Sequence, residues 1–184
     1  MGRLIFSAIA SLDGYTVDAS GSFDWAEPEP ELHAFVNDLE RGIGTYLYGR
    51  RMYETMRFWQ DPPLTEDDGV YAEYAAIWQD ADKVVYSSSL AEATTPRTRV
   101  LQRFDADEVR HLVEDSERDV SIGGPTLATE AFAAGLVDEV WLFLSPVSVG
   151  GGTPALPVGL RLDLELLDER RFARGAVGLH YAVR

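Results

Sequence analysis

The residues Ile122-Gly123-Gly124-Pro125-Thr126-Leu127 join a predicted strand to a predicted helix. Residues 120–122 read as a strand, and residues 125–134 continue as a helix that Gly135 ends. Glycines let a ligand approach the backbone closely, and a proline suits the first helical turn. The free N–H groups of that turn and the helix dipole favour a phosphate. A plain tight turn would use the same residues, so this stretch alone leaves both interpretations open.

Strands and helices alternate on both sides of this turn. Residues 140–144 are apolar on both faces, which predicts a central strand. Residues 162–167 and 177–183 alternate like an antiparallel pair. Further strands are expected at residues 4–12, 45–48, 83–86 and 99–101, helices at 32–39, 50–59, 71–78 and 105–116, and exposed loops at 15–28 and 62–68. This order predicts an α/β fold with a mostly parallel mixed sheet, helices on both faces and an antiparallel C-terminal hairpin.

Length and charge narrow the class of protein. The chain has 184 residues, which predicts one domain over residues 1–184. Its formal net charge of −15 argues against nucleic acid and anionic membranes as partners. We see no signal peptide and no apolar stretch that could span a bilayer, so we expect a cytoplasmic protein.

Several kinds of site are not expected. The chain has no cysteine, and His33, His111 and His180 lack metal-ligand spacing, so no metal site is predicted. The single lysine, Lys83, follows no glycine-rich loop, which excludes a P-loop. The first strand is not followed by G-x-G-x-x-G, which disfavours a Rossmann site. The glycines at residues 150–152 are expected to reverse the chain.

Two more turns resemble the first in pattern. Gly49-Arg50-Arg51 again joins a strand to a helix, where two cations would oppose the helix dipole. A bound anion would resolve this conflict, although solvated arginines near Glu54 are the alternative. Ser87-Ser88-Ser89 follows a strand, where hydroxyl and N–H groups can hold a phosphate. The alternative for the serines is an ordinary polar loop.

Five segments in this order resemble the dihydrofolate reductase-like superfamily, especially the branch related to the reductase domain of bacterial riboflavin biosynthesis. They are ASLDG at 10–14, YGRRMYE at 48–54, VVYSSS at 84–89, IGGPTL at 122–127 and VDEVWLFLSPVSVGGGTP at 137–154. The resemblance implies an NADPH cofactor. It assigns the pyrophosphate to Gly49, Arg50 and Arg51 and to Gly123, Gly124, Pro125, Thr126 and Leu127, the 2′-phosphate to Ser87, Ser88 and Ser89, and the nicotinamide to the strand end from Ile9 and Ala10 to Gly14. The family often has a threonine where this chain has Met52.

The resemblance also implies the chemistry, an NADPH-dependent reduction of a small pterin- or pyrimidine-like heterocycle by hydride transfer. Glu31, just before Leu32, stands where dihydrofolate reductases carry an acidic residue that would protonate or orient the substrate ring. Asp13 or a bound water is the other expected proton source. Glu31 is alternatively part of an acidic helix start, and Trp25 and Trp59 are expected as flat walls of the pocket. The alternative function is a dinucleotide-binding protein of the same fold without reductase activity.

Two expectations concern partners and selectivity. We expect NADPH to be preferred over NADH, because Arg50, Arg97 and Arg99 accompany the serine loop in an acidic chain. We also expect a homodimer, because the C-terminal hairpin offers an exposed edge with Tyr181 and Val183 on one face. Members of the resembling family often dimerise as well.

Overall fold

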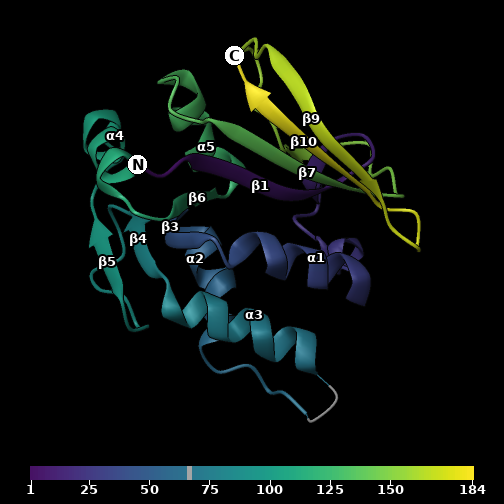
Figure 1. Ribbon diagram of the computed structural model, residues 1–184, viewed down its shortest axis with the longest axis horizontal. Coiled ribbons are helices and arrows are strands. Elements are labelled where there is room, and N and C mark those ends of the chain that lie inside the picture. The colour runs from purple at the N-terminus through teal and green to yellow at the C-terminus, as the bar shows by residue number, and fades with distance from the viewer. Residues whose placement is uncertain (66–67) are drawn as a thin grey trace.

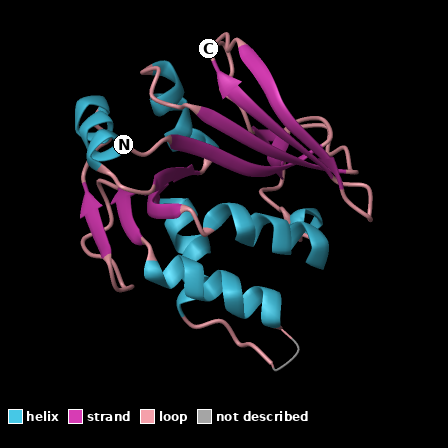
Figure 2. Cartoon of the chain, in the orientation of Figure 1, coloured by secondary structure: helices cyan, strands magenta, loops and turns pink. Residues whose placement is uncertain are grey.

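The computed structural model describes residues 1–65 and 68–184, so Glu66 and Asp67 of the expected acidic loop lie outside the described residues (Figures 1 and 2). Eight strands form one sheet in the order β5-β4-β3-β6-β1-β7-β10-β9. Its strands are β1 (Leu4–Ser11), β3 (Ile43–Gly49), β4 (Asp82–Tyr86), β5 (Thr98–Leu101), β6 (Asp119–Gly123), β7 (Glu139–Ser145), β9 (Leu164–Arg171) and β10 (Val177–Val183). A separate two-stranded sheet pairs β2 (Tyr15–Asp18) with β8 (Gly152–Pro154). The expected fold class is confirmed. The neighbours β5, β4, β3, β6, β1 and β7 run parallel, and the last hairpin, β9 and β10, is antiparallel.

The helices cover both faces of the sheet, as Figure 1 shows. They are α1 (Pro30–Glu40), α2 (Arg50–Met56), α3 (Gly69–Asp80), α4 (Ala106–Asp115) and α5 (Pro125–Ala133), with short 3-10 turns η1 (Asp24–Ala26) and η2 (Arg57–Gln60). The first three helices lie on one face, where α1 packs on Trp141 and Phe143. The other two helices lie on the opposite face, where α5 packs on Phe6 and Leu47. No helix among the described residues is long and apolar enough to cross a membrane.

Three elements differ from the expectations. Residues 15–18, expected as loop, form β2, which pairs with a strand more than 130 residues away and so leaves no local pattern. The helix expected at 50–59 ends at Met56 and continues as a 3-10 turn. The last hairpin begins at Leu164, and seven of the eight residues of β9 are exposed, as suits an edge strand that pairs on one side only.

Candidate functional site

The three turns singled out in the sequence lie side by side at one edge of the sheet. β4, β3 and β6 are neighbours and run parallel, so their carboxyl ends meet. Tyr48 is opposite Gly123, and Gly49 is opposite Tyr86. Since neighbouring strands are about 4.8 Å apart, the three turns span about 10 Å. The carboxyl edge of a parallel sheet is where ligands of α/β proteins bind.

The Gly123-Gly124 turn needs both of its glycines. A Cβ atom on Gly123 would lie 2.7 Å from the Tyr48 ring, and Gly124 has a φ of +90°. No side-chain hydrogen bond caps α5, so the N–H groups of its first turn face outward without a protein acceptor of that kind. Packing therefore explains Gly123, whereas the uncapped helix start fits a phosphate group.

The Gly49 turn lies against the first turn of α5. A Cβ atom on Gly49 would be 3.9 Å from the Cβ of Leu127. Arg51 is exposed, and the Nη1 of Arg50 lies 3.4 Å from the Oε1 of Glu54. The dipole of α2 opposes the two arginines less than the sequence indicated, because α2 has only seven residues and Arg50 has a carboxylate partner. The two arginines still bring positive charge next to the glycine turns.

The three serines of the serine loop have different roles in the structure. The Ser87 hydroxyl accepts hydrogen bonds from the backbone N–H of Ser89 at 3.2 Å and of Leu90 at 3.0 Å. Ser87 is buried, whereas Ser88 and Ser89 are exposed. Ser87 therefore holds the turn. Ser88 and Ser89 are exposed at the carboxyl edge, and the Ser89 hydroxyl lies 3.4 Å from that of Ser87.

One of the three arginines expected near this loop lies elsewhere. Arg97 precedes β5 and pairs with Asp82, at 3.1 Å, at the opposite edge of the sheet, so the expectation for Arg97 is wrong. Arg99 is opposite Val84, three residues before the serine loop. Sequence reasoning missed Arg103, which stands two residues beyond Leu101, the residue whose carbonyl accepts the Ser87 N–H at 2.8 Å. The Arg103 side chain is 86% exposed. A basic residue just after an edge strand was the signal that could have found it.

The end of β1 leaves backbone groups without a sheet partner on one side. β1 pairs with β6 only over Leu4 to Phe6, but with β7 as far as Ser11. Ile9 packs on the α1 side of the sheet, and Ala10 is fully buried. In open α/β sheets, ligands usually bind outside the carboxyl ends of the strands, at the strand where the chain order reverses. The end of β1 lies beside the β6 turn that carries the two glycines.

Trp25 lies in η1, which contacts β1. Its indole Nε1 is buried without a hydrogen-bond partner among the described residues. A buried N–H of this kind normally finds an acceptor, so its position fits a bound group with a carbonyl. Trp59 instead packs among His33, Tyr71 and Tyr74, between α1 and α3, and forms no pocket wall there.

Asp13 joins two loops at the end of β1. Its carboxylate accepts hydrogen bonds from the backbone N–H of Val149 at 3.0 Å and of Gly150 at 2.7 Å. The Ser11 hydroxyl and these two N–H groups hold the pKa of Asp13 well below its usual range. The glycines expected merely to reverse the chain thus return to the end of β1, and Gly152 lies so close to the backbone of Val17 that no side chain would fit. Asp13 is consequently an acceptor that positions loops, and it is a poor proton donor.

Glu31 is engaged by the C-terminal hairpin. Its Oε1 lies 3.2 Å from the Nη2 of Arg170, and its Oε2 accepts the Ala173 N–H at 3.1 Å. Glu29 accepts the Arg174 N–H at 2.8 Å in the same way. The acidic start of α1 therefore ties this helix to the hairpin, and the structure does not leave Glu31 free toward the end of β1.

The chain matches the family model described as the RibD C-terminal domain over residues 3–177. It is 30% identical over 182 residues to the uncharacterized protein YyaP of Bacillus subtilis (strain 168), covering 97% of this chain and 94% of that protein. A putative riboflavin biosynthesis protein from Shewanella sp. PV-4 is similar in structure, with a TM-score of 0.76, 17% identity and 99% of each chain covered. Dihydrofolate reductase from Enterococcus faecalis, solved in complex with NADP(H), has a TM-score of 0.67 at 15% identity and covers 100% of this chain and 97% of its own. The protein belongs to the RibD C-terminal domain family and shares the fold of dihydrofolate reductase.

Proposed function

We propose that the protein is an NADPH-dependent reductase of a small pterin- or pyrimidine-like heterocycle. The observation that carries this proposal is the adjacency of the three turns and the partly unpaired end of β1 at one sheet edge. Membership of a reductase-like family supports it, as does the similarity to a dihydrofolate reductase that binds NADP(H).

Different residues at this edge of the sheet would bind different parts of the cofactor. The first turn of α5, from Pro125 to Leu127, and the Gly49-Arg51 turn would hold the pyrophosphate. Ser88, Ser89 and Arg103 would hold the 2′-phosphate, whose second negative charge suits an exposed arginine. The free backbone side of Ile9 and Ala10 would face the nicotinamide ring.

The hydrogen bonds that Asp13 and Glu31 already accept from the protein bear on the source of the proton. When bound, NADPH would supply the hydride. Asp13 and Glu31 already accept protein hydrogen bonds, so we propose that they position the pocket walls and that a water molecule delivers the proton. The buried Trp25 N–H would orient a carbonyl of the bound heterocycle.

The engagement of both carboxylates by protein hydrogen bonds favours a second candidate function. Because neither carboxylate is free, the chain could bind the dinucleotide without reducing a substrate. A binding protein of this kind would keep the three turns and need no proton donor.

One set of measurements separates these candidates. We expect calorimetry to show NADPH binding tighter than NADH, and NADPH oxidation in the presence of at least one compound from a panel of oxidised pterins and aminopyrimidinones. Binding without oxidation would support the second candidate, and failure to bind either dinucleotide would contradict both. The Glu31→Gln variant tests whether that carboxylate is the proton donor, since loss of a general acid lowers turnover by about a hundredfold or more. We expect a smaller loss, together with a lower melting temperature.

We also propose a homodimer that works in the cytoplasm, where NADPH is available. The edge that invites association is β9, where Leu166 and Leu167 are 48% and 46% exposed. Tyr181 and Val183, expected at this edge, pack instead against the core on the α5 face. Light scattering at micromolar concentration should give twice the chain mass, and Leu166→Lys should lower it. A monomeric mass for the wild-type protein would contradict the proposal.

A further inference from the structure

A cavity lies on the α1 face of the sheet, at the amino ends of β1, β6 and β7, the opposite edge from the three turns. Its volume is about 150 Å³. Ile5, Leu39, Ile43 and Trp141 form its apolar walls. We call it the amino-edge cavity. No residue assigned above to the cofactor or substrate lines it.

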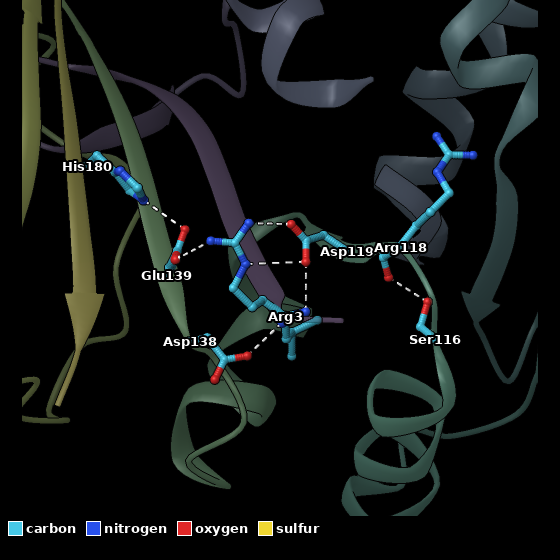
Figure 3. Close-up of polar contacts among 8 residues, drawn as sticks. Arg3, Ser116, Arg118, Asp119, Asp138, Glu139 and His180 are labelled. Carbon is cyan, nitrogen blue, oxygen red and sulfur yellow. Dashed lines mark hydrogen bonds and ion pairs between the residues drawn. The ribbon is translucent and has the colours of Figure 1, made fainter. Parts of the chain in front are cut away.

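Most charges around the amino-edge cavity satisfy one another. Arg3 reaches Asp119 at 2.5 Å and Glu139 at 2.6 Å, and Glu139 lies 2.8 Å from the Nε2 of His180 (Figure 3). Figure 3 shows these side chains converging from β1, β6, β7 and β10. This network leaves no charged group of Arg3 in need of a further partner.

Glu40 is the exception. It lines the cavity at the end of α1, and the residue is only 7% exposed. Its Oε2 is buried without a hydrogen bond of good geometry among the described residues, and its polar neighbour is the Tyr46 hydroxyl, which also lacks such a bond. A buried polar group without a partner is costly, and a buried carboxylate is more so. The hydroxyls of Ser7 and Ser121 line the same cavity, so hydrogen-bonding capacity gathers around an unmet acceptor.

We propose that the amino-edge cavity is a second binding site, for a small flat molecule that carries an amidinium or a similar cationic N–H group held by Glu40. A planar amidinium can place two N–H groups on one carboxylate, which is the strong geometry for such pairs. The apolar walls and the Trp141 ring suit a flat body. A cavity of about 150 Å³ holds benzene where its lining is apolar, so a single ring is the size expected.

The charge of Glu40 makes the binding depend on pH. Burial raises the pKa of Glu40 to about 7, and the hydroxyl of Tyr46 offsets part of that effect. The other titratable or charged groups around Glu40 are Arg3, Asp119, Glu139 and His180 on the sheet and Tyr48 and Tyr74 beside Tyr46. A cation binds the ionised carboxylate, so its affinity should fall about tenfold for each pH unit below 7.

Benzamidine is a suitable probe, and benzamide is its neutral counterpart. We expect saturable one-to-one binding of benzamidine to the full chain at pH 8, measured by calorimetry, with the Trp141 indole signal shifting in NMR spectra. Benzamide should bind more than tenfold more weakly. Glu40→Gln should weaken benzamidine more than tenfold and remove most of the pH dependence, since the shape of the side chain is kept and its charge is lost. Glu130→Gln, an exposed change of the same kind on α5, should leave binding unchanged.

Four results would overturn the proposal. They are the absence of saturable binding, equal affinity for benzamide and benzamidine, equal affinity in the Glu40→Gln variant, and displacement of benzamidine by NADPH. The last result would place the probe at the cofactor edge. Because NADPH is titrated separately, failure of this site is distinguishable from failure of the proposed reductase function.

Discussion

The Oδ2 of Asp13 lies 2.7 Å from the backbone nitrogen of Gly150, whose N–H it accepts. Its Oδ1 accepts the neighbouring Val149 N–H at 3.0 Å, so one side chain fastens the loop after β1 to the loop after β7. These loops flank the partly unpaired end of β1, which makes Asp13 a positioning residue.

We expect Asp13→Ala to lower turnover and to speed hydrogen exchange at Val149 and Gly150. The pH profile of the remaining activity should keep its shape, because the depressed pKa of Asp13 leaves it ionised throughout the working range. Asp68→Ala removes a carboxylate that, among the described residues, accepts side-chain hydrogen bonds from the nearby Thr65 alone, and it should change neither readout. A missing limb in the pH profile of Asp13→Ala would show instead that Asp13 carries the proton.

A negative charge in the first turn of α5 should block the phosphate without harming the fold. Thr126 is exposed there, and an aspartate at this position would interact favourably with the helix dipole and so stabilise the helix. We expect Thr126→Asp to lower NADPH affinity by about tenfold or more, since like charges about 4 Å apart near a surface repel by about 4 kcal/mol. The melting temperature should stay equal or rise. Gly124→Asp is a poorer test, because the φ of +90° adds backbone strain to the charge.

Thr129→Asp provides the matched control for Thr126→Asp. Thr129 is also exposed on α5, one turn further from the start of the helix. Its substitution should leave NADPH affinity within about twofold, because the dipole effect fades within the first turn. Equal loss in both variants would mean that net charge, rather than the turn, controls binding.

Arg103 should decide between NADPH and NADH. It follows β5 beside the serine loop, where the 2′-phosphate would lie. Loss of a charge-assisted hydrogen bond of about 1.5–3 kcal/mol predicts that Arg103→Gln weakens NADPH by about ten- to a hundredfold and leaves NADH unchanged. Arg97→Gln, at the opposite edge beside Asp82, should affect neither dinucleotide. Calorimetry with both dinucleotides tests this, and an equal loss for the two would remove Arg103 from the selectivity.

The parts of the site that the sequence predicted are those coded by short, local patterns. The Gly123-Gly124 turn, the Gly49 turn and the serine loop each follow a buried parallel strand, so their positions along the chain already indicate one sheet edge. The order of strands adds what no local pattern contains. β6 lies between β3 and β1, and this brings the Gly123-Gly124 turn beside both the Gly49 turn and the partly unpaired end of β1.

The parts that the sequence did not predict depend on distant partners. In the sequence, Asp13 looks like part of a turn and Glu31 like a free acid. In the structure, Asp13 accepts a hydrogen bond from Gly150 and Glu31 accepts one from Ala173. Arg97 appears close to the serines along the chain, but a strand runs from one edge of the sheet to the other, and the start of β5 lies far from its end. In each case pairing across more than 130 residues, or the direction of a strand, decides the role of the side chain.

Glu40 should make stability fall as the pH rises. Its folded pKa of about 7 lies above the ordinary value of 4.5, so the unfolded chain releases this proton first. Below about pH 4.5 both states keep the proton and the folded state bears no penalty. Between about pH 4.5 and 7 the penalty grows, and above pH 7 it is complete. At about 1.36 kcal/mol per unit, the upper limit is about 3 kcal/mol.

Glu40→Gln should therefore stabilise the protein by up to about 3 kcal/mol at pH 8 and by little at pH 4.5, measured as the free energy of unfolding in urea. Taking the difference between variant and wild type at each pH cancels the titration of the other carboxylates. Buried Lys83, whose pKa is lowered to about 8, acts in the window from about pH 8 to 10.5, where its loss of charge makes stability rise with pH. The two windows do not overlap, so they can be read separately. A difference between Glu40→Gln and wild type that stays constant from pH 4.5 to 8 would show that Glu40 titrates normally and that its carboxylate has found a partner in the folded protein.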